Sequence, residues 1–404
     1  MILVVGYGVS GKGAMSLLQK QGISAIAVDK NPREGVQLDS IDFPLEDISL
    51  VIVSPGVLPS HPLVLKAKEQ GIEVIGELSF ALRSTKNRCI GITGSNGKTT
   101  TTLLTAHALR SAGMKARAVG NVGIALSSVV LDIDPEEILV IELSSFQLEN
   151  MREKKLDVAA YLNLTPNHLD RHASMKEYAT AKANIQQCLK PAGKLFVSEQ
   201  VCRYGSHGLR PENLVIFPDS FASDLPRSFL GEQNISAAAA LTAWFGVNQE
   251  TFLASLPMFE KPAHRLEWVA VSGDIQYYND SKATSVEAVL HAVSCFEGPL
   301  VLIVGGVDKG ASYAPWIDPF RGKMKKIVAY GAAAEKIARA LAPFYPLHQV
   351  ATLKDAIDAA NQSARAGDTV LLSPGCSSYD QFRSYEHRGD EFKRLVRETI
   401  GVHS

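Results

Sequence analysis

Short apolar runs that alternate with helical stretches predict an α/β fold along the whole chain. Runs of this kind occupy residues 2–5, 23–28, 50–53, 89–93, 138–143, 158–162, 275–278, 300–304, 326–330 and 369–373. Most of them end in a glycine-rich or polar turn, and a stretch with helical periodicity then follows. Strands joined in this way by helices form parallel sheets, whose binding sites lie along the carboxyl edge. The polar residues that follow each run are therefore the candidate functional residues.

The strongest chemical signal follows the apolar run at residues 89–93. It is a glycine turn that opens a helix expected to continue to about Ala112, and it reads Gly94-Ser95-Asn96-Gly97-Lys98-Thr99-Thr100. Glycines let backbone N–H groups curl around phosphate oxygens, and a helix N-terminus adds positive potential. Lys98 can reach the outer phosphates, and the Thr99 hydroxyl can bind Mg²⁺. The segment is shorter than the general phosphate-loop pattern, which has a further glycine where Ile92 stands. An ordinary strand–turn–helix link is the alternative, but it gives the lysine and the hydroxyls no purpose.

The first 88 residues predict a small α/β unit that binds a diphosphate or a ribose. The first run enters a Gly-x-Gly-x-x-Gly turn, Gly6-Tyr7-Gly8-Val9-Ser10-Gly11, and the second run ends at Asp29. An acidic residue about twenty positions after such a turn is typical of dinucleotide-binding folds. The third run ends in the loop Ser54-Pro55-Gly56, at the edge where such folds bind ligands. The alternative is that these glycines serve only close packing of a helix against a strand.

The length of the chain and two breaks in its pattern predict three domains. A chain of 404 residues is too long for one typical core. A polar break at residues 86–88 directly precedes the phosphate loop, and prolines at positions 257 and 262 mark a second break. We therefore expect domains at residues 1–88, 89–260 and 261–404, of which the first contains the diphosphate-type turn and the second contains the phosphate loop.

Composition narrows the classes of partner. The formal net charge is −1 and no basic block is present, which argues against nucleic acid or an anionic membrane as the main partner. Five widely spaced cysteines provide neither a disulfide framework nor a zinc motif, so a reducing cytoplasm is expected. The N-terminal apolar run is too short for a signal peptide or a membrane span.

Further polar residues follow the later runs. Glu142 stands at the end of the run at 138–143, where a carboxylate commonly provides a second anchor for Mg²⁺. His168 follows the run at 158–162 and is flanked by polar residues, so we expect it in a site. Lys182 lies in a predicted helix over residues 176–189, and its pattern alone favours a surface lysine. The third domain adds five polar segments: His264-Arg265, Asn279-Asp280-Ser281-Lys282-Ala283-Thr284, Gly305 to Lys309, Ser373 to Ser378 and Asp380-Gln381-Phe382.

Taken in order, these segments resemble the Mur ligase family. The resemblance rests on Thr93 to Thr100, Glu142 to Leu148, Asn163 to Arg171, Tyr178 to Lys182, His264-Arg265, Asn279 to Thr284 and Ser373 to Phe382, and it extends from Gly6 to about Gly389. It implies three α/β domains: a Rossmann-like N-terminal domain, a central P-loop ATPase-type domain with a parallel sheet, and a Rossmann-like C-terminal domain. The segments Asn279 to Thr284 and Ser373 to Cys376 are similar to the branch that adds D-glutamate to UDP-N-acetylmuramoyl-L-alanine.

The resemblance also implies a mechanism and a set of metal ligands. In this family ATP phosphorylates a carboxylate, an amine attacks the acyl phosphate, and the tetrahedral intermediate loses phosphate. The reaction belongs to the cytoplasmic stage of peptidoglycan synthesis and hence to cell-wall growth and division. Lys98, Glu142, His168 and Lys182 would be catalytic. Two Mg²⁺ ions are implied, one on Thr99 and Glu142 and one on His168 and on Lys182, whose side chain would be carbamylated by CO₂.

The remaining expected contacts also come from the resemblance. Asn234, Arg265, Asp280 and Lys282 would bind ATP in addition to the phosphate loop. Gly8, Val9, Ser10, Gly11, Asp29, Ser54, Pro55, Gly56 and Asn121 would bind the UDP-sugar. Thr284, Lys309, Ser378 and Tyr385 would bind D-glutamate. The chain departs from the family pattern at Tyr385, where phenylalanine is expected, and at Lys30-Asn31, where threonine and arginine are expected. We expect a monomer.

Three alternative functions are considered. A folylpolyglutamate synthase has the same ligase architecture, but we expect such an enzyme to begin directly with the ATP domain. An NAD-dependent dehydrogenase would explain Gly6 to Gly11 and leave Lys98, Glu142 and Lys182 without a purpose. A nucleotide-driven switch or transport ATPase would hydrolyse ATP without any amino acid.

Overall fold

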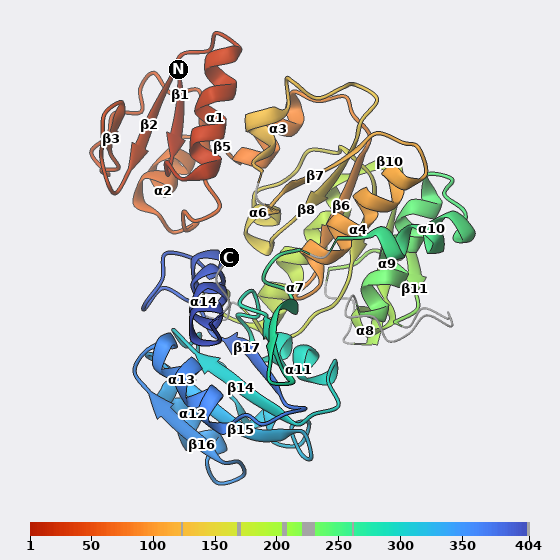
Figure 1. Ribbon diagram of the computed structural model, residues 1–404. Coiled ribbons are helices and arrows are strands. Elements are labelled where there is room, and N and C mark those ends of the chain that lie inside the picture. The colour runs from red at the N-terminus through yellow and green to blue at the C-terminus, as the bar shows by residue number, and fades with distance from the viewer. Residues whose placement is uncertain (123, 168–170, 204–207, 220–230, 261, 402–404) are drawn as a thin grey trace. The chain divides into compact units, whose positions relative to one another are not determined.

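The computed structural model describes residues 1–122, 124–167, 171–203, 208–219, 231–260 and 262–401. These residues form two compact units. The first takes in most of residues 1–259, and the second takes in residues 262–401 together with 165–167 and 171–175. Three sheets, two in the first unit and one in the second, give the chain an α/β fold built mainly on parallel strands (Figure 1). The predicted fold class is confirmed.

The first sheet is parallel and has the strand order β3-β2-β1-β4-β5. Its strands are β1 (Ile2–Val5), β2 (Ala25–Asp29), β3 (Val36–Leu38), β4 (Leu50–Val53) and β5 (Glu73–Gly76). The helices are α1 (Val9–Lys20), α2 (Pro62–Glu69) and α3 (Glu77–Arg83). All four residues of β1 are buried, as a central strand covered on both faces requires. The strand order changes direction at β1, so the turn after β1 lies where such folds bind ligands.

The second sheet is also parallel and has the order β11-β10-β9-β6-β8-β7. Its strands are β6 (Cys89–Thr93), β7 (Ala116–Gly120), β8 (Ile138–Glu142), β9 (Leu156–Tyr161), β10 (Leu189–Ser198) and β11 (Leu214–Phe217). The helices that follow these strands along the chain are α4 (Lys98–Ser111), α5 (Leu126–Val129), α6 (Ser145–Glu149), α7 (Met175–Ala183), α8 (Glu199–Arg203), α9 (Glu232–Trp244) and α10 (Gln249–Ser255). The central strand β6 pairs with β8 and β9, and the turn after β6 is the phosphate loop.

The helix predicted over residues 176–189 is shorter than expected. Helix α7 ends at Ala183, a 3₁₀ helix covers Asn184–Cys188, and Leu189 already begins β10. The Asn184 side chain accepts a hydrogen bond from Gln187 Nε2 at 3.0 Å and donates one to Leu148 O at 3.4 Å. Asparagine side chains that bond locally in this way compete with helical bonding. This break in helical hydrogen bonding explains why the helix ends at Ala183, before the predicted end at residue 189.

The third sheet belongs to the second unit and has the order β12-β13-β17-β14-β15-β16. Its strands are β12 (Glu267–Ser272), β13 (Ile275–Asn279), β14 (Leu300–Gly305), β15 (Met324–Tyr330), β16 (Leu347–Val350) and β17 (Thr369–Gly375), and only β12 is antiparallel to its neighbour. The helices are α11 (Val286–Ser294), α12 (Ala334–Leu341), α13 (Leu353–Ser363) and α14 (Tyr385–Thr399). Two buried clusters cover opposite faces of the sheet, one with α11 and α12 and one with α13 and α14. The sheet is therefore doubly wound, and its carboxyl edge carries the polar segments.

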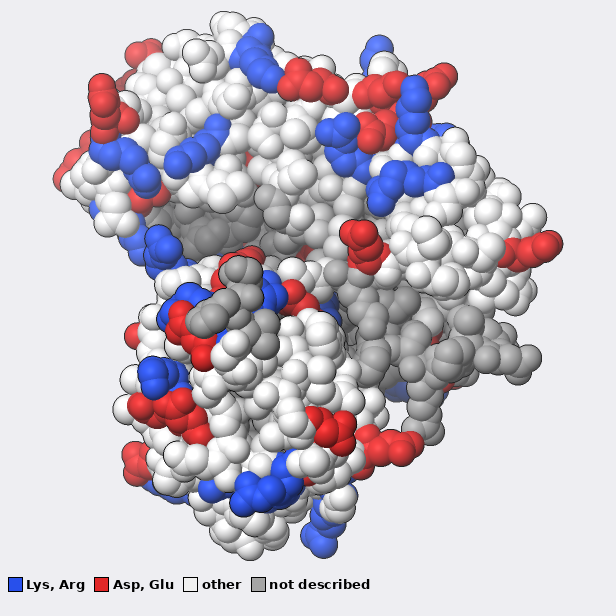
Figure 2. Space-filling view, in the orientation of Figure 1, with Lys and Arg blue, Asp and Glu red and all other residues white. Residues whose placement is uncertain are grey.

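Surface charge is mixed in sign. On the face drawn in Figure 2, basic and acidic side chains of the described residues are interspersed and neither sign forms a continuous patch. No helix among the described residues is long and apolar enough to cross a membrane.

Candidate active site

The phosphate loop takes a conformation that its glycines make possible. Gly94 and Gly97 have φ angles of +158° and +77°, and α4 begins at Lys98 directly after Gly97. A Cβ atom at Gly97 would lie 2.1 Å from Asn234 Oδ1, so a side chain there would collide with the end of a predicted ATP-binding residue. Lys98 Nζ donates to Gly94 O and to Ser95 O, each at 2.9 Å. The lysine thus lies over the loop whose N–H groups would hold phosphate.

Asn163 braces this loop, a role that the sequence did not assign to it. Its Oδ1 accepts from Asn96 N at 2.8 Å and its Nδ2 donates to Asn96 O at 3.2 Å, while its own carbonyl accepts from Ser95 N at 3.0 Å. The Nδ2 group also donates to Gln233 Oε1 at 2.7 Å, one residue before Asn234. The amide both accepts from and donates to the backbone of Asn96, as a paired residue of a neighbouring strand does, and so fixes the conformation of the loop. The available signal was its place just after β9, beside the strand that ends in the phosphate loop.

Thr99 and Glu142 are both buried and provide oxygen ligands of the kind that Mg²⁺ prefers. Their residues are 3% and 2% exposed, and Glu142 ends β8, which pairs directly with β6. Asn121 Nδ2 donates to Glu142 Oε1 at 3.0 Å. The structure therefore pairs Asn121, which was predicted to contact the UDP-sugar, with the predicted metal ligand. This donor set, a hydroxyl and a buried carboxylate beside a phosphate loop, fits one Mg²⁺ ion.

Lys182 is buried beside the same loop, contrary to the surface position that its pattern alone favours. Its residue is 1% exposed, and its Nζ donates to Gly94 O at 2.7 Å and lies 4.5 Å from the centre of the Tyr178 ring. Burial, reinforced by the positive charge of Lys98, holds the pKa of Lys182 well below its usual value, although Glu142 acts in the opposite direction. Burial therefore disfavours the charged form of the side chain, and the neutral amine is the form that can react with CO₂.

His168 lies outside the described residues, so its predicted role stays a prediction. Among the residues that the structure describes, no group of three His, Cys, Asp or Glu side chains could hold a metal. The predicted ligand set does not depend on such a group, because two of its four members are a threonine and a modified lysine.

In the first sheet, the Asp29 side chain is hydrogen-bonded to the backbone of the glycine turn. Asp29 Oδ2 accepts from Tyr7 N at 2.6 Å and its Oδ1 from Asn31 N at 2.9 Å, and these bonds help to lower the pKa of Asp29, the Tyr7 bond most strongly. Ser54 Oγ donates to Gly6 O at 2.8 Å, and a Cβ at Gly11 would lie 1.9 Å from that same oxygen. The structure thus brings the turn together with Asp29 and Ser54. Gly8 and Val9 are exposed at the turn, with no atom within 4 Å of the place of a Cβ on Gly8.

In the second unit, Asp280 is buried at the end of β13 and held by two donors. Ser373 Oγ donates to its Oδ2 at 2.8 Å and Leu266 N to its Oδ1 at 3.3 Å. Burial raises the pKa of Asp280 to about 7, although these donors and the charge of Arg265 act to lower it. Arg265 Nε is buried and has no hydrogen-bond partner in the described part of the chain, which leaves a donor for a ligand.

The four residues predicted to bind the amino acid lie on loops after three strands and at the start of α14. Lys309 Nζ, after β14, donates to Thr284 Oγ1, after β13, at 3.3 Å. Ser378 follows β17 and is buried. Tyr385 is the first residue of α14, and Lys282 Nζ lies 5.1 Å from the centre of its ring. The structure therefore joins Lys309 to Thr284 and Tyr385 to the predicted ATP residue Lys282.

Two family descriptions match this chain. The Mur ligase middle domain matches residues 92–205, and the Mur ligase glutamate ligase domain matches residues 264–376. The chain is also 41% identical to the UDP-N-acetylmuramoylalanine–D-glutamate ligase of Protochlamydia amoebophila, over 98% of this chain and 97% of that protein. The enzyme of the same name from Solibacter usitatus is 38% identical over the same shares. This chain belongs to the Mur ligase family.

Solved structures of Mur ligases have the same fold. The UDP-N-acetylmuramate–alanine ligase MurC of Thermotoga maritima is 17% identical with a TM-score of 0.63, and the match covers 98% of this chain and 99% of that one. A folylpolyglutamate-type enzyme, FolC of E. coli, has a TM-score of 0.59 at 15% identity, and the match covers 80% of this chain and 92% of that one. The match with the folate enzyme leaves about a fifth of this chain uncovered.

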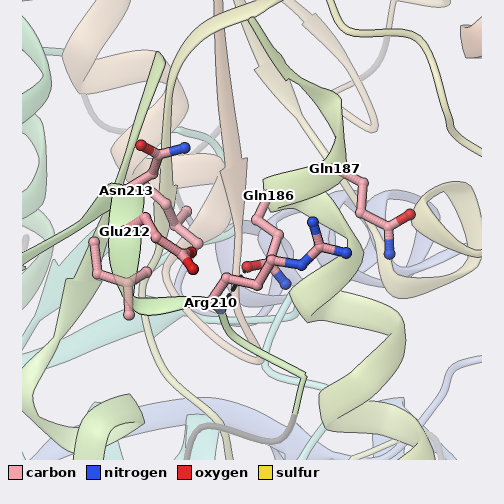
Figure 3. A pocket seen from close by; sticks show the side chains of 7 residues that line it. Gln186, Gln187, Arg210, Glu212 and Asn213 are labelled. Carbon is pink, nitrogen blue, oxygen red and sulfur yellow. Dashed lines mark hydrogen bonds between the residues drawn. The ribbon is translucent and has the colours of Figure 1, made fainter. Parts of the chain in front are cut away.

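The pocket drawn in Figure 3 is separate from the predicted site residues of this Mur ligase. It lies between the 3₁₀ helix after α7 and strands β10 and β11, and Gln186, Arg210 and Asn213 are among the polar side chains that line it. Its volume is about 120 Å³, whereas small-molecule sites measure roughly 300–1,000 Å³. Gln186 Oε1 accepts from Arg210 N at 2.7 Å, so the side chain bonds to the pocket wall. The pocket is too small for a nucleotide.

Proposed function

We propose that this Mur ligase joins D-glutamate to UDP-N-acetylmuramoyl-L-alanine and converts ATP to ADP and phosphate. The observation that carries the proposal is the joint burial of Lys182 and Glu142 at a phosphate loop, in a chain that aligns over nearly its full length with the D-glutamate ligases of Protochlamydia amoebophila and Solibacter usitatus. The loop provides the site for the triphosphate. The segments after β13, β14 and β17 provide cationic and hydroxyl groups for an amino acid with two carboxylates.

The proposed reaction begins with activation of a carboxylate. At neutral pH a carboxylate does not accept an amine, because oxide is too poor a leaving group. The alanyl carboxylate oxygen attacks the γ-phosphorus of ATP, the bond to the bridging oxygen breaks, and ADP leaves. Lys98 and the loop N–H groups stabilise charge on the phosphoryl oxygens. Mg²⁺, when bound by Thr99 and Glu142, would neutralise further phosphate charge.

The second step forms the amide. The amine of D-glutamate attacks the acyl carbon, the tetrahedral intermediate expels phosphate, and the amine loses its proton. Lys309, Thr284 and Ser378 would hold the two carboxylates of the amino acid so that its amine faces the acyl phosphate. Binding that fixes reacting groups in this way can supply much of the rate of such a step.

Lys182 would act as a carbamate. Its neutral amine would attack CO₂ to form a C–N bond and release one proton, which gives an N-carboxylate with two oxygen ligands for a second Mg²⁺. Lysine itself offers no oxygen to a hard cation. The buried position and the lowered pKa of Lys182 support this assignment. His168 would be a further ligand of that ion.

We also propose that the enzyme acts in the cytoplasm and that it is a monomer.

The test is phosphate release with ATP, Mg²⁺ and UDP-N-acetylmuramoyl-L-alanine, with single D- and L-amino acids added in turn. Release that requires D-glutamate is expected, and the Lys98→Ala variant, in the same assay, should release little. Release with a different amino acid would transfer the enzyme to another branch of the family. Release without any amino acid would support a nucleotide-driven switch and contradict the ligase proposal.

A further inference from the structure

Tyr313 connects two loops at the carboxyl edge of the third sheet. The residue is 2% exposed and lies in the loop after β14, four residues beyond Lys309. Its hydroxyl lies 2.9 Å from Asp308 Oδ1 and 3.1 Å from the Sγ atom of Cys376, which follows β17. The hydroxyl is therefore shared between the loop that carries Lys309 and the loop that carries Ser378.

The chemistry of the three groups fixes the direction of both hydrogen bonds. An ionised carboxylate can only accept, and a tyrosine hydroxyl has one proton, so Tyr313 donates to Asp308 and Cys376 donates its S–H to Tyr313. Burial raises the pKa of Cys376 to about 11 and raises that of Tyr313 further. Partial burial acts to raise the pKa of Asp308, but hydrogen bonds from Lys336 and Tyr313 lower it overall. All three groups keep these protonation states near neutral pH.

Asp308 is held at its second oxygen as well. Lys336 Nζ, on α12, donates to Oδ2 at 2.6 Å, and Gly310 N donates to the same atom at 3.1 Å. The Asp308 carboxylate thus connects three groups: the backbone N–H of Gly310, which follows Lys309, the Lys336 side chain on α12, and the Tyr313 hydroxyl. Each end of the short segment Asp308–Gly310 is fixed by this one side chain.

The backbone of the two loops is joined at the same place. Val307 N donates to Ser377 O at 2.8 Å, and Ser377 N donates to Val307 O at 3.0 Å. Val307 and Ser377 each stand next to a member of the side-chain cluster and within two residues of a predicted substrate residue. The side chains of Asp308, Tyr313 and Cys376 therefore add to the two backbone hydrogen bonds that hold the loop after β14 against the loop after β17.

We infer that Tyr313 and Asp308 are positioning residues for the amino-acid subsite, which set the relative placement of Lys309 and Ser378 for the two carboxylates of the incoming amino acid. The inference rests on the proposed function. A lysine side chain has many rotamers, so its charge is placed well only if its backbone is fixed. A binding group displaced by an ångström loses much of its effect. Tyr313 and Asp308 act through Lys309 and Ser378 and do not themselves touch the substrate.

The test compares Tyr313→Phe with Tyr277→Phe. Tyr277 is equally buried, at 2%, and its hydroxyl donates to Asn361 Oδ1 at 2.9 Å, but it packs in the cluster on the opposite face of the sheet. Each variant removes one buried hydroxyl and the hydrogen bond that it donates, and Tyr313→Phe also removes the acceptor of the Cys376 S–H group. We expect Tyr313→Phe to raise the KM for D-glutamate roughly 5- to 10-fold, the scale of one hydrogen bond. The KM for ATP should change less than about twofold, and Tyr277→Phe should leave both unchanged.

A second measurement does not depend on turnover. Iodoacetamide should alkylate Cys376, detected by peptide mapping, faster in Tyr313→Phe than in wild type or Tyr277→Phe, because the thiol loses its acceptor and the two loops loosen. Equal alkylation in all three proteins, or equal KM values for D-glutamate in both variants, would overturn the inference. If wild type releases no phosphate with D-glutamate, the proposed function fails, and the alkylation rates still test the cluster. If Tyr313→Phe does not fold, Asp308→Asn is the alternative variant, because an amide has only one oxygen and cannot accept from both Tyr313 and Lys336. It must raise the KM for D-glutamate in the same selective way, or the inference is wrong.

Discussion

Lys182 Nζ donates to the carbonyl oxygen of Gly94 at 2.7 Å, and Lys98 Nζ donates to the same oxygen at 2.9 Å. Two ammonium groups on one buried carbonyl repel each other, and this repulsion favours the neutral form of one of the two amines. Lys182 is the more deeply buried and has the strongly lowered pKa. This relationship ties the lysine of the phosphate loop to the lysine proposed to carry the carbamate.

A carbamate at Lys182 should be directly observable. Addition of ¹³C-bicarbonate to the wild-type protein should give a carbamate carbon signal, and Lys182→Ala should lack it. Lys176→Ala is the matched control, because Lys176 lies in the same helix and is exposed. Lys182→Ala should also lose most of its activity and regain part of it with small carboxylic acids. An identical ¹³C spectrum in Lys182→Ala would contradict the assignment.

Gly97→Ala should abolish nucleotide binding for two separable reasons. The φ angle of +77° disfavours any residue with a Cβ, by about 1–2 kcal/mol, and the new methyl group would collide with Asn234 Oδ1. Gly113→Ala is the control, since Gly113 has a φ angle of +81° and no atom within 4 Å of the Cβ position. Titration with ADP, followed by thermal shift, should show binding by wild type and Gly113→Ala and none by Gly97→Ala. Comparable ADP affinity in both variants would show that the contact with Asn234 does not matter.

Asp280 should make stability depend on pH. Its folded pKa, about 7, lies above the ordinary value of 3.8, so the folded state binds the proton more tightly than the unfolded state. The stabilisation is complete below about pH 4 and is lost as the pH rises toward 7, by up to about 1.4 kcal/mol for each pH unit. Urea unfolding at several pH values should therefore show that the Asp280→Asn variant falls less steeply with pH between 4 and 7 than wild type. Parallel curves for the two proteins would mean that Asp280 has an ordinary pKa when folded.

The sequence predicted the loops better than the contacts between them. Glycines and a lysine after a strand specify the phosphate loop locally, and the strand β6 was placed at Cys89–Thr93 as observed. Nothing local marks Lys182 as buried, because the short helix α7 gives no clear apolar face and its position is decided by packing against Tyr178 and Gly94. Asn163 escaped assignment for a similar reason, since its partners at Asn96 and Gln233 are about 70 residues away in either direction. Long-range pairing of this kind leaves no periodic trace.

Arg388 is another residue whose long-range contacts the sequence did not reveal, and replacing it should destabilise the second unit. The side chain is fully buried on α14, and its guanidinium donates to Ser281 Oγ at 2.9 Å, Ser281 O at 2.7 Å and Cys376 O at 3.1 Å. Those acceptors lie on the loops after β13 and β17, which carry Lys282 and Ser378. Arg388→Met would leave three buried acceptors without a donor, and each costs about 1–3 kcal/mol.

The matched control for Arg388 is Arg394→Met on the same helix. Arg394 is exposed and bonds only to Glu391 and Glu398 among the described residues, and surface ion pairs of this kind contribute about 0–1 kcal/mol. Chemical unfolding should therefore show a loss of several kcal/mol for Arg388→Met, by the same reasoning, and almost none for Arg394→Met. Arg388→Lys keeps the charge but cannot span both loops with a single ammonium group, so it should fall between the two. A small and equal loss in all three variants would show that the buried guanidinium does not hold the loops together.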